Sequence, residues 1–227
     1  MPTVTVPKAI DAGLRNLKAN FWPYMLIIVI LGILESFSNG SGIREGMNSG
    51  NWFFWGPVSG GLLASFITVF VKPVFEYGAK MTFLRGHRDQ EVDVRDIIRG
   101  FDSRSLYIDI ILTNIMVMLA IIFGFICLIL PGIYIACRTV LAPLLVMDKG
   151  LGPQEAFKAS WALTRIHWPV ALQLGIVATL MIIGGLLLLV VGMIPAFAWV
   201  KAMFTSFYQQ VLDAHDEQFL LSLDIEP

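Results

Sequence analysis

The fold is decided by residues 130–168, which read LPGIYIACRTVLAPLLVMDKGLGPQEAFKASWALTRIHW. A Pro-Gly pair near its start precedes an apolar segment that contains one Arg and one further Pro. A polar Asp-Lys-Gly sequence then leads into a short amphipathic helix that ends at Trp168. This order of hairpin turn, membrane span, turn and surface helix recurs in weaker form along the chain. The stretch therefore indicates an all-α, polytopic membrane protein.

The composition of the 227-residue chain also indicates an integral membrane protein. Hydrophobic residues make up 56% of the chain and charged residues 15%, whereas a soluble domain has about 25% charged residues. The net charge of −1 argues against a nucleic-acid partner, because that interface needs an excess of Lys and Arg. Cys127 and Cys137 lie in apolar surroundings, so they predict two buried side chains rather than a disulfide or a metal site.

The hydrophobicity pattern predicts six transmembrane helices and three amphipathic surface helices. Each surface helix has apolar residues on one face and charged residues mostly on the other. The expected surface helices are residues 7–20, 92–101 and 153–165, and the expected spans are residues 24–37, 58–84, 106–130, 133–147, 169–193 and 196–212. Pro131 and Gly132 are expected to turn the chain between two spans. Residues 38–57 are expected to form the one long loop on their side of the membrane.

The distribution of Lys and Arg predicts how the chain is oriented. Twelve of the 16 basic residues lie in or beside the surface helices, Arg44 alone lies on the opposite side, and three lie within spans. Basic residues stay on the cytoplasmic side, so both termini are expected in the cytoplasm and the loop 38–57 outside. Residues 1–21 contain no continuous apolar region, so no signal peptide is expected. We expect a multi-pass protein of the inner (cytoplasmic) membrane.

An internal threefold repeat is expected within a single membrane domain, residues 1–227. The three surface helices align without gaps when Trp22, Leu106 and Trp168 are superposed, and two spans follow each of them. The expected units of surface helix, span and span are residues 7–86, 92–148 and 153–215. Repeats of this kind that keep one topology can surround an approximate threefold axis.

Three basic residues within the predicted spans are the candidate functional residues. Lys72, Arg138 and Lys201 each belong to the second span of one unit, and Glu76 lies one helical turn from Lys72. An ionised group at the bilayer centre costs roughly 2.5–3.5 kcal/mol, so such groups usually face protein or water. We interpret Lys72, Glu76, Arg138 and Lys201 as a candidate site for an anionic lipid or another anionic ligand.

Two structural explanations of the same residues remain open. The long side chains can extend to the outer headgroups, or they can pair across helices with Glu35 and Glu76. Arg138 and Lys201 follow Pro131 and Pro195 by seven and six residues. We therefore expect them at a similar depth in the outer half of the membrane.

No catalytic residue, metal site or cofactor is expected. His87, His167 and His215 are isolated from one another in the sequence. The chain contains no nucleophile elbow, no Walker loop and no His-Glu-x-x-His motif.

The opening stretch contains the motifs LPGI (130–133), LAPLLVMDKG (141–150) and EAFKASW (155–161), followed by Thr164 and HW (167–168). Together these motifs resemble a broad group of prokaryotic membrane proteins. The group includes the membrane domain attached to some glycerophosphoryl diester phosphodiesterases and related stand-alone six-span proteins of bacterial inner membranes. The resemblance implies a six-span membrane module without the soluble catalytic domain.

The hydrolase activity is not expected to transfer with this resemblance. The sequence His87-Arg88 is followed by Asp89, where the phosphodiesterase has the Gly of a His-Arg-Gly motif.

Three function classes are compatible with the sequence. The first is a non-enzymatic inner-membrane protein that interacts with membrane lipids, with a partner membrane protein or with a second copy of itself. The second is a transporter or binder of an anionic lipid or small amphiphile that uses the intramembrane basic residues. The third is a membrane-embedded enzyme, for which Glu35, Glu76, Asp109 and the histidines form no recognisable catalytic pair.

Overall fold

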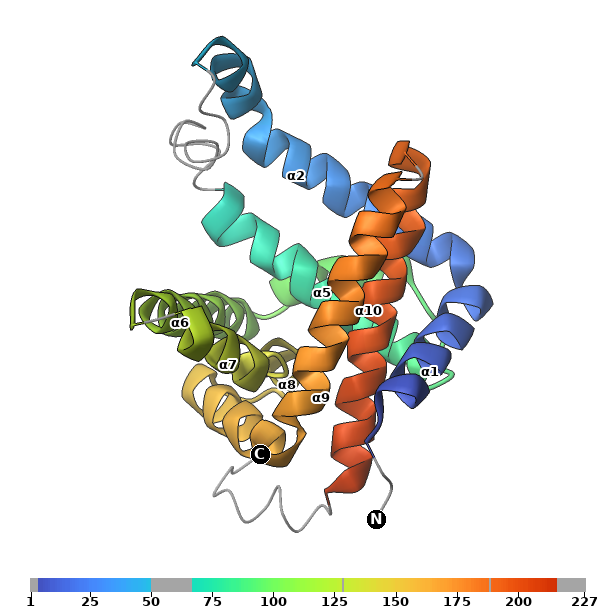
Figure 1. Ribbon diagram of the computed structural model, residues 1–227, viewed down its shortest axis with the longest axis vertical. Coiled ribbons are helices and arrows are strands. Elements are labelled where there is room, and N and C mark those ends of the chain that lie inside the picture. The colour runs from blue at the N-terminus through green and yellow to red at the C-terminus, as the bar shows by residue number, and fades with distance from the viewer. Residues whose placement is uncertain (1–3, 50–66, 128, 188, 216–227) are drawn as a thin grey trace.

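The computed structural model describes residues 4–49, 67–127, 129–187 and 189–215, which are 90% helical and contain no strand (Figure 1). The elements in chain order are α1 (Val6–Ala19), α2 (Phe21–Ser49), the π-helical turn η1 (Ile67–Val71), α5 (Lys72–His87), the 3₁₀ helix η2 (Val94–Phe101), α6 (Arg104–Cys127), α7 (Ile129–Thr139), α8 (Ala142–Lys149), α9 (Pro153–Leu187) and α10 (Leu189–Ala214). The predicted all-α class is confirmed.

Three segments of the described chain are long and apolar enough to cross a membrane. They are Arg104–Ile126, Leu130–Lys149 and Pro153–Leu187. A fourth is added if Val6–Ala19 and Phe21–Glu35, which meet at an angle of 96°, count as one broken span. Two pairs of helices pack along each other, α9 with α10 and α6 with α7, whereas α2 touches both α10 and α5 (Figure 1).

The loop expected at residues 38–57 is partly wrong, because α2 continues through the Gly- and Ser-rich residues as far as Ser49. Glycine in a helix interior costs only about 1 kcal/mol relative to alanine, and no proline interrupts this part of the chain. The helix that begins in the apolar part of α2 can therefore continue through the Gly- and Ser-rich residues. The remainder of that loop and residues 58–66 of the second expected span lie outside the described residues.

The chain also turns earlier than the Pro131-Gly132 pair. Helix α6 ends at Cys127 and α7 begins at Ile129, so Pro131 occupies the first turn of α7, where a missing backbone N–H is tolerated. Gly132 instead allows close packing: a Cβ on Gly124 would lie 2.8 Å from the Gly132 Cα. The expected fourth span is broken between α7 and α8, two residues before Pro143.

The surface helices differ from the expectation in form. The second is the 3₁₀ helix η2, and the third is not separate from the fifth span, because both belong to the single helix α9 with Pro169 inside it. In Figure 1 the amber first part of α9 lies at an angle to the vertical orange part. Each of the three segments packs on a helix that is distant from it in the sequence or separated from it by a turn: α1 on α10, η2 on α5, and α9 on α7.

Small residues and hydroxyl groups bring these packed segments close together. A Cβ on Gly13 of α1 would lie 2.9 Å from the Met203 Cα in α10. Gly78 of α5 directly faces the backbone of Ile97 in η2, and Ser160 of α9 donates a hydrogen bond to the last turn of α7. Residues with larger side chains at Gly13 or Gly78 would push the elements apart.

Polar contacts near one end of the bundle tie α1, α2 and α5 together. The Tyr24 ring stacks on Phe83 with centroids 4.0 Å apart, and its hydroxyl donates to Asn16 Oδ1 at 2.7 Å. Asn16 Nδ2 donates in turn to the Phe83 carbonyl at 3.0 Å. Asn16 is buried, so these bonds satisfy a side chain that would otherwise destabilise the fold.

Candidate functional site

Arg138 lies in the last turn of α7 and is fixed there by hydroxyl groups from α9. The helix breaks after Thr139, so its last carbonyls lack partners within the helix. The Arg138 carbonyl accepts hydrogen bonds from Ser160 Oγ at 2.8 Å and Thr164 Oγ1 at 3.0 Å. Such side-chain donors are the usual means of satisfying broken helices in a membrane. These two hydrogen bonds thus hold the backbone of Arg138 against the first part of α9.

The guanidinium of Arg138 is enclosed by aromatic rings. Its Cζ lies 4.6 Å from the centroid of Trp161 and 5.6 Å from that of Tyr134. Tyr134 is one helical turn before Arg138, and its ring packs edge-on against both Trp161 and Trp168. Both contacts lie within the distance at which a cation is attracted to an aromatic face. The rings therefore restrict where the guanidinium can point.

Arg138 is 3% exposed, and its Nε has no hydrogen-bond partner. The ion pairs found in the described part of the chain do not include Arg138. A buried charge is normally paired, and a buried N–H group is normally hydrogen-bonded. Arg138 departs from both rules.

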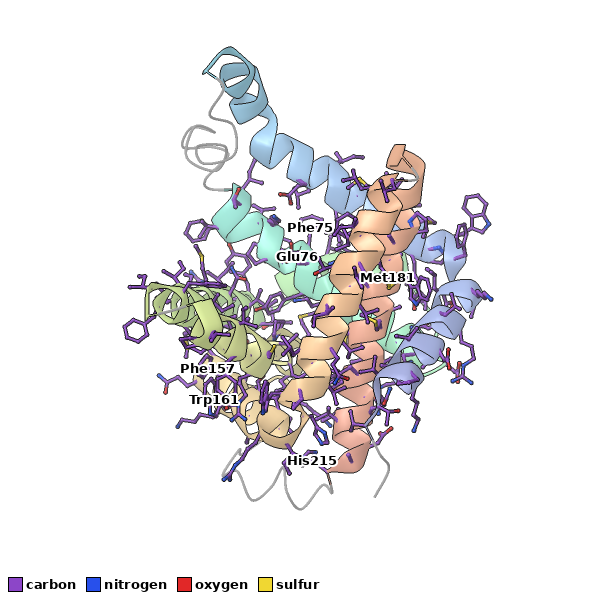
Figure 2. All side chains as sticks on the ribbon, in the orientation of Figure 1. Phe75, Glu76, Phe157, Trp161, Met181 and His215 are labelled. Carbon is purple, nitrogen blue, oxygen red and sulfur yellow. The ribbon has the colours of Figure 1, made fainter. Side chains whose placement is uncertain are left out.

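Arg138 forms part of the wall of an open groove with a volume of about 880 Å³, which is within the range of small-molecule sites. The walls come from α6, α7, the first part of α9 and the end of α10. Phe157 and Trp161 lie on the first part of α9, and His215 directly follows the lower end of α10 (Figure 2). Lys158, Arg165 and His215 also line the groove, and its described lining residues include no carboxylate.

The other sequence-predicted residues lie elsewhere and are close to acidic groups. Lys72 Nζ is 2.6 Å from Glu35 Oε2 and 4.0 Å from Glu76 Oε1. Lys201 lies within electrostatic range of Glu76 and Lys72. Glu76 lies on α5 well away from Phe157 and Trp161 (Figure 2). The structure brings Lys72, Glu76 and Lys201 near one another, pairs Lys72 with Glu35 across helices, and leaves Arg138 in a separate site.

The side chains that contact Arg138 come from an unexpected part of the chain. The backbone and side-chain partners of Arg138, Ser160, Trp161 and Thr164, belong to the segment that was expected to be the third surface helix. The sequence predicts one straight span at residues 133–147 and a separate helix at residues 153–165 that lies flat on the membrane. The broken α7–α8 and the continuous α9 instead place this segment beside Arg138.

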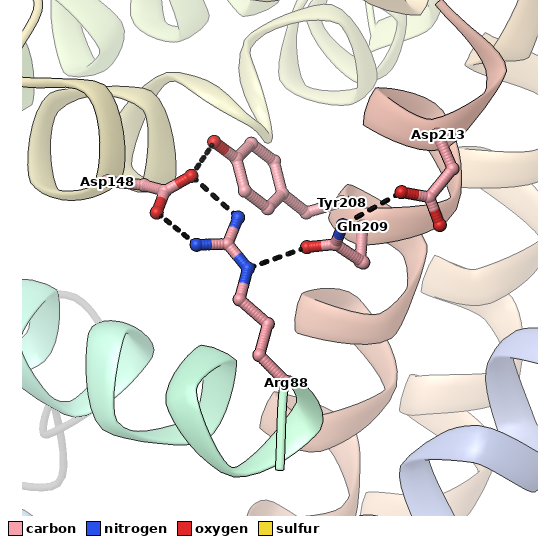
Figure 3. A network of polar contacts seen from close by, with 5 residues as sticks. All are labelled: Arg88, Asp148, Tyr208, Gln209 and Asp213. Carbon is pink, nitrogen blue, oxygen red and sulfur yellow. Dashed lines mark hydrogen bonds and ion pairs between the residues drawn. The ribbon is translucent and has the colours of Figure 1, made fainter. Parts of the chain in front are cut away.

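A second polar network, which the sequence did not reveal, connects three helix ends (Figure 3). Arg88 binds the Asp148 carboxylate with two nitrogens at 2.5 and 2.9 Å, and its Nε donates to Gln209 Oε1 at 2.9 Å. The Tyr208 hydroxyl donates to Asp148 Oδ2 at 2.9 Å, and Gln209 Nε2 donates to Asp213 Oδ1 at 2.8 Å. The hydrogen bond to Asp148 raises the pKa of Arg88, because the carboxylate stabilises the charged form. Every charged group at its centre has a partner, so the network is structural.

The histidines provide no metal site among the described residues, where no group of three or more His, Cys, Asp or Glu side chains could hold an ion. His167 and His215 do lie close together, with ring centroids 5.6 Å apart. His87 lies at the end of α5, where burial lowers the pKa of its imidazole.

The groove residues Lys158, Trp161 and Arg165 were not singled out as site residues by sequence reasoning. Lys158 and Arg165 are spaced seven residues apart, which places them on one face of the helix with Trp161 between them. That spacing alone also describes an ordinary solvated face. Only the packing of α9 on α7 shows that the face meets Arg138.

Comparisons of the chain with protein-family models, with curated proteins and with solved structures found no match. The likeness to the phosphodiesterase membrane domain therefore stays a prediction based on residues 130–168.

Proposed function

We propose that the protein is a non-enzymatic integral membrane protein that binds an anionic amphiphile, with the charged head on Arg138 and the apolar part in the adjacent groove. The observation that carries this proposal is the buried Arg138 guanidinium, which has an unpartnered Nε and no carboxylate among the described residues that line its groove. An anionic head in the groove would supply the counter-charge that Arg138 lacks among the described residues.

The shape and composition of the groove favour an amphiphile over a small polar anion. Ala120, Phe123, Ile135 and Ile166 contribute apolar surface beside the basic residues. Phe123 is 68% exposed and Ile166 is 76% exposed, so the apolar side of the groove is open along the outside of the helices. In a membrane this outside is in contact with acyl chains. A lipid could thus enter sideways with its head toward Arg138.

The proposed architecture has six spans in three repeated units, with both termini in the cytoplasm and the protein in the inner membrane. The contacts of the surface segments support the threefold arrangement. Each segment packs on the second span of the preceding unit: α1 on α10, η2 on α5, and the start of α9 on α7. The first unit thus packs on the third, the second on the first and the third on the second, as expected of three units around an axis. The bias of Lys and Arg supports the orientation.

The test is mass spectrometry of the lipids that remain bound after extraction in a mild detergent. The wild-type protein is compared with Arg138→Gln and with Lys149→Gln, which removes an exposed lysine outside the groove. We expect a stoichiometric anionic lipid in the wild type and in Lys149→Gln, and its loss in Arg138→Gln. Retention of the same anionic lipid by a folded Arg138→Gln protein would contradict the proposal. Size-exclusion chromatography and thermal unfolding report whether each variant is folded.

A further inference from the structure

The charges around the groove specify the head group of the amphiphile more closely. Arg138, Lys158 and Arg165 are three basic residues that line one groove, and His215 lines it with them. The described lining residues hold no carboxylate to balance these charges. A head group with a single negative charge would neutralise Arg138 and leave Lys158 and Arg165 to water.

The geometry allows the cations to act on the same head. Lys158 and Arg165 are two helical turns apart on α9, and Trp161 between them packs on the Arg138 guanidinium at 4.6 Å. Phe157 stacks along Trp161 with centroids 6.1 Å apart and closes the same wall. The buried Arg138 and the exposed Lys158 and Arg165 thus line the same groove, along the aromatic wall.

We propose that the head group is a phosphomonoester, so that the ligand is a lipid of the phosphatidic acid type. This inference rests on the proposed function and adds the chemical class of the head. A phosphomonoester carries about −1.5 to −2 charges at neutral pH and three acceptor oxygens. A phosphodiester lipid or a fatty acid carries a single charge. Arginine binds phosphate through two parallel hydrogen bonds, and Arg138 lines the groove without an ion pair in the described part of the chain.

The test measures binding of four ligands to the full-length protein in nanodiscs of zwitterionic lipid. They are phosphatidic acid, phosphatidylglycerol with the same acyl chains, the matching fatty acid, and glycerol 3-phosphate without chains. We expect phosphatidic acid to bind roughly tenfold more tightly than phosphatidylglycerol or the fatty acid, as two further exposed charge pairs would give. Glycerol 3-phosphate is expected to bind much more weakly, because it lacks the apolar part.

Variants separate this inference from the proposed function. In Lys158→Gln/Arg165→Gln both phospholipids should still bind, but with affinities within about twofold of each other, because the extra charge pairs are gone. In Arg138→Gln neither should bind. Lys149→Gln is the matched control and should retain the full preference. Both side chains of the double variant are exposed, so the fold should persist.

The possible outcomes are distinct. Equal binding of the two phospholipids to the wild type, or an unchanged preference in the double variant, would overturn the phosphomonoester assignment while the groove remains an anion site. Tight binding of glycerol 3-phosphate would overturn the lipid as the source of the head. Binding of both phospholipids without any effect of Arg138→Gln would overturn the proposed function itself.

Discussion

At the scale of single residues, the half-buried Arg88 and the buried Arg138 differ in how their charge is balanced. Arg88 shares two hydrogen bonds with Asp148 and a third with Gln209. Arg138 has aromatic faces, an unpartnered Nε and no ion pair in the described regions. A charged side chain that has a counter-charge and hydrogen-bond partners usually stabilises the fold. A buried charged side chain without them is the better candidate for ligand binding. This contrast is the reason for assigning structure to Arg88 and ligand binding to Arg138.

Replacing Asp148 by Asn should destabilise the protein. The side chain of Asp148 is 5% exposed and that of Arg88 is 27% exposed, so the change leaves a half-buried arginine without its counter-charge. We expect a loss of roughly 2–4 kcal/mol in unfolding free energy, somewhat below the value for a fully buried pair. Unfolding in mild detergent by heat or by SDS measures it. Asp213→Asn is the control, because Asp213 is exposed and accepts from Gln209 alone in the network of Figure 3; an equal loss there would contradict the assignment.

Acidification should destabilise the protein in part through His87. Burial lowers the pKa of this imidazole, so the unfolded chain takes up a proton near its ordinary pKa of about 6.5 while the folded protein does not. Stability should therefore fall as the pH decreases from about 7.5 to 5.5. The variant His87→Gln should show a smaller decrease in melting temperature over this interval. An identical pH dependence in both proteins would mean that His87 is as accessible to protons when folded as when unfolded.

At the scale of elements, much of the fold follows from the sequence. The amphipathic pattern of residues 7–20 predicts α1 to within a residue of its observed bounds, and apolar length predicts α6 and much of α9. The breaks are less predictable. The chain turns before Pro131 rather than at it, and Pro169 does not end α9. A proline in a helix removes one hydrogen bond, and whether the helix breaks depends on what packs around it.

Close packing between α5 and η2 gives a prediction at this scale. A Cβ on Gly78 would meet the backbone carbonyl of Ile97, which cannot move aside as a side chain can. We expect Gly78→Ala to lower the unfolding free energy by roughly 1–3 kcal/mol, as overpacking does. Gly32 in α2 has no atom within 4 Å of such a Cβ, so Gly32→Ala should leave stability unchanged or slightly raised. Equal effects of the two variants, measured by unfolding in detergent, would contradict the packing described for η2.

At the scale of the whole molecule, the groove exists only because distant segments meet. Its walls come from α6, α7, the start of α9 and the end of α10. The sequence identifies Arg138 as unusual, since it is a charge within an apolar segment. It does not identify Trp161, because a tryptophan on an amphipathic helix is common at a membrane surface. Their meeting depends on the break after Thr139 and on the hydroxyls of α9, which only the packed structure places together.

The most direct measurement is photo-crosslinking of lipid to the protein in its native membrane. A photoreactive amino acid is placed at Phe157, which lines the groove, or at Leu180, which is 62% exposed on α9 but outside the groove. The crosslinked lipids are then identified by mass spectrometry. We predict that anionic lipids are enriched at position 157 over position 180, and that Arg138→Gln removes this enrichment. The same lipid composition at both positions, unchanged by Arg138→Gln, would contradict the account.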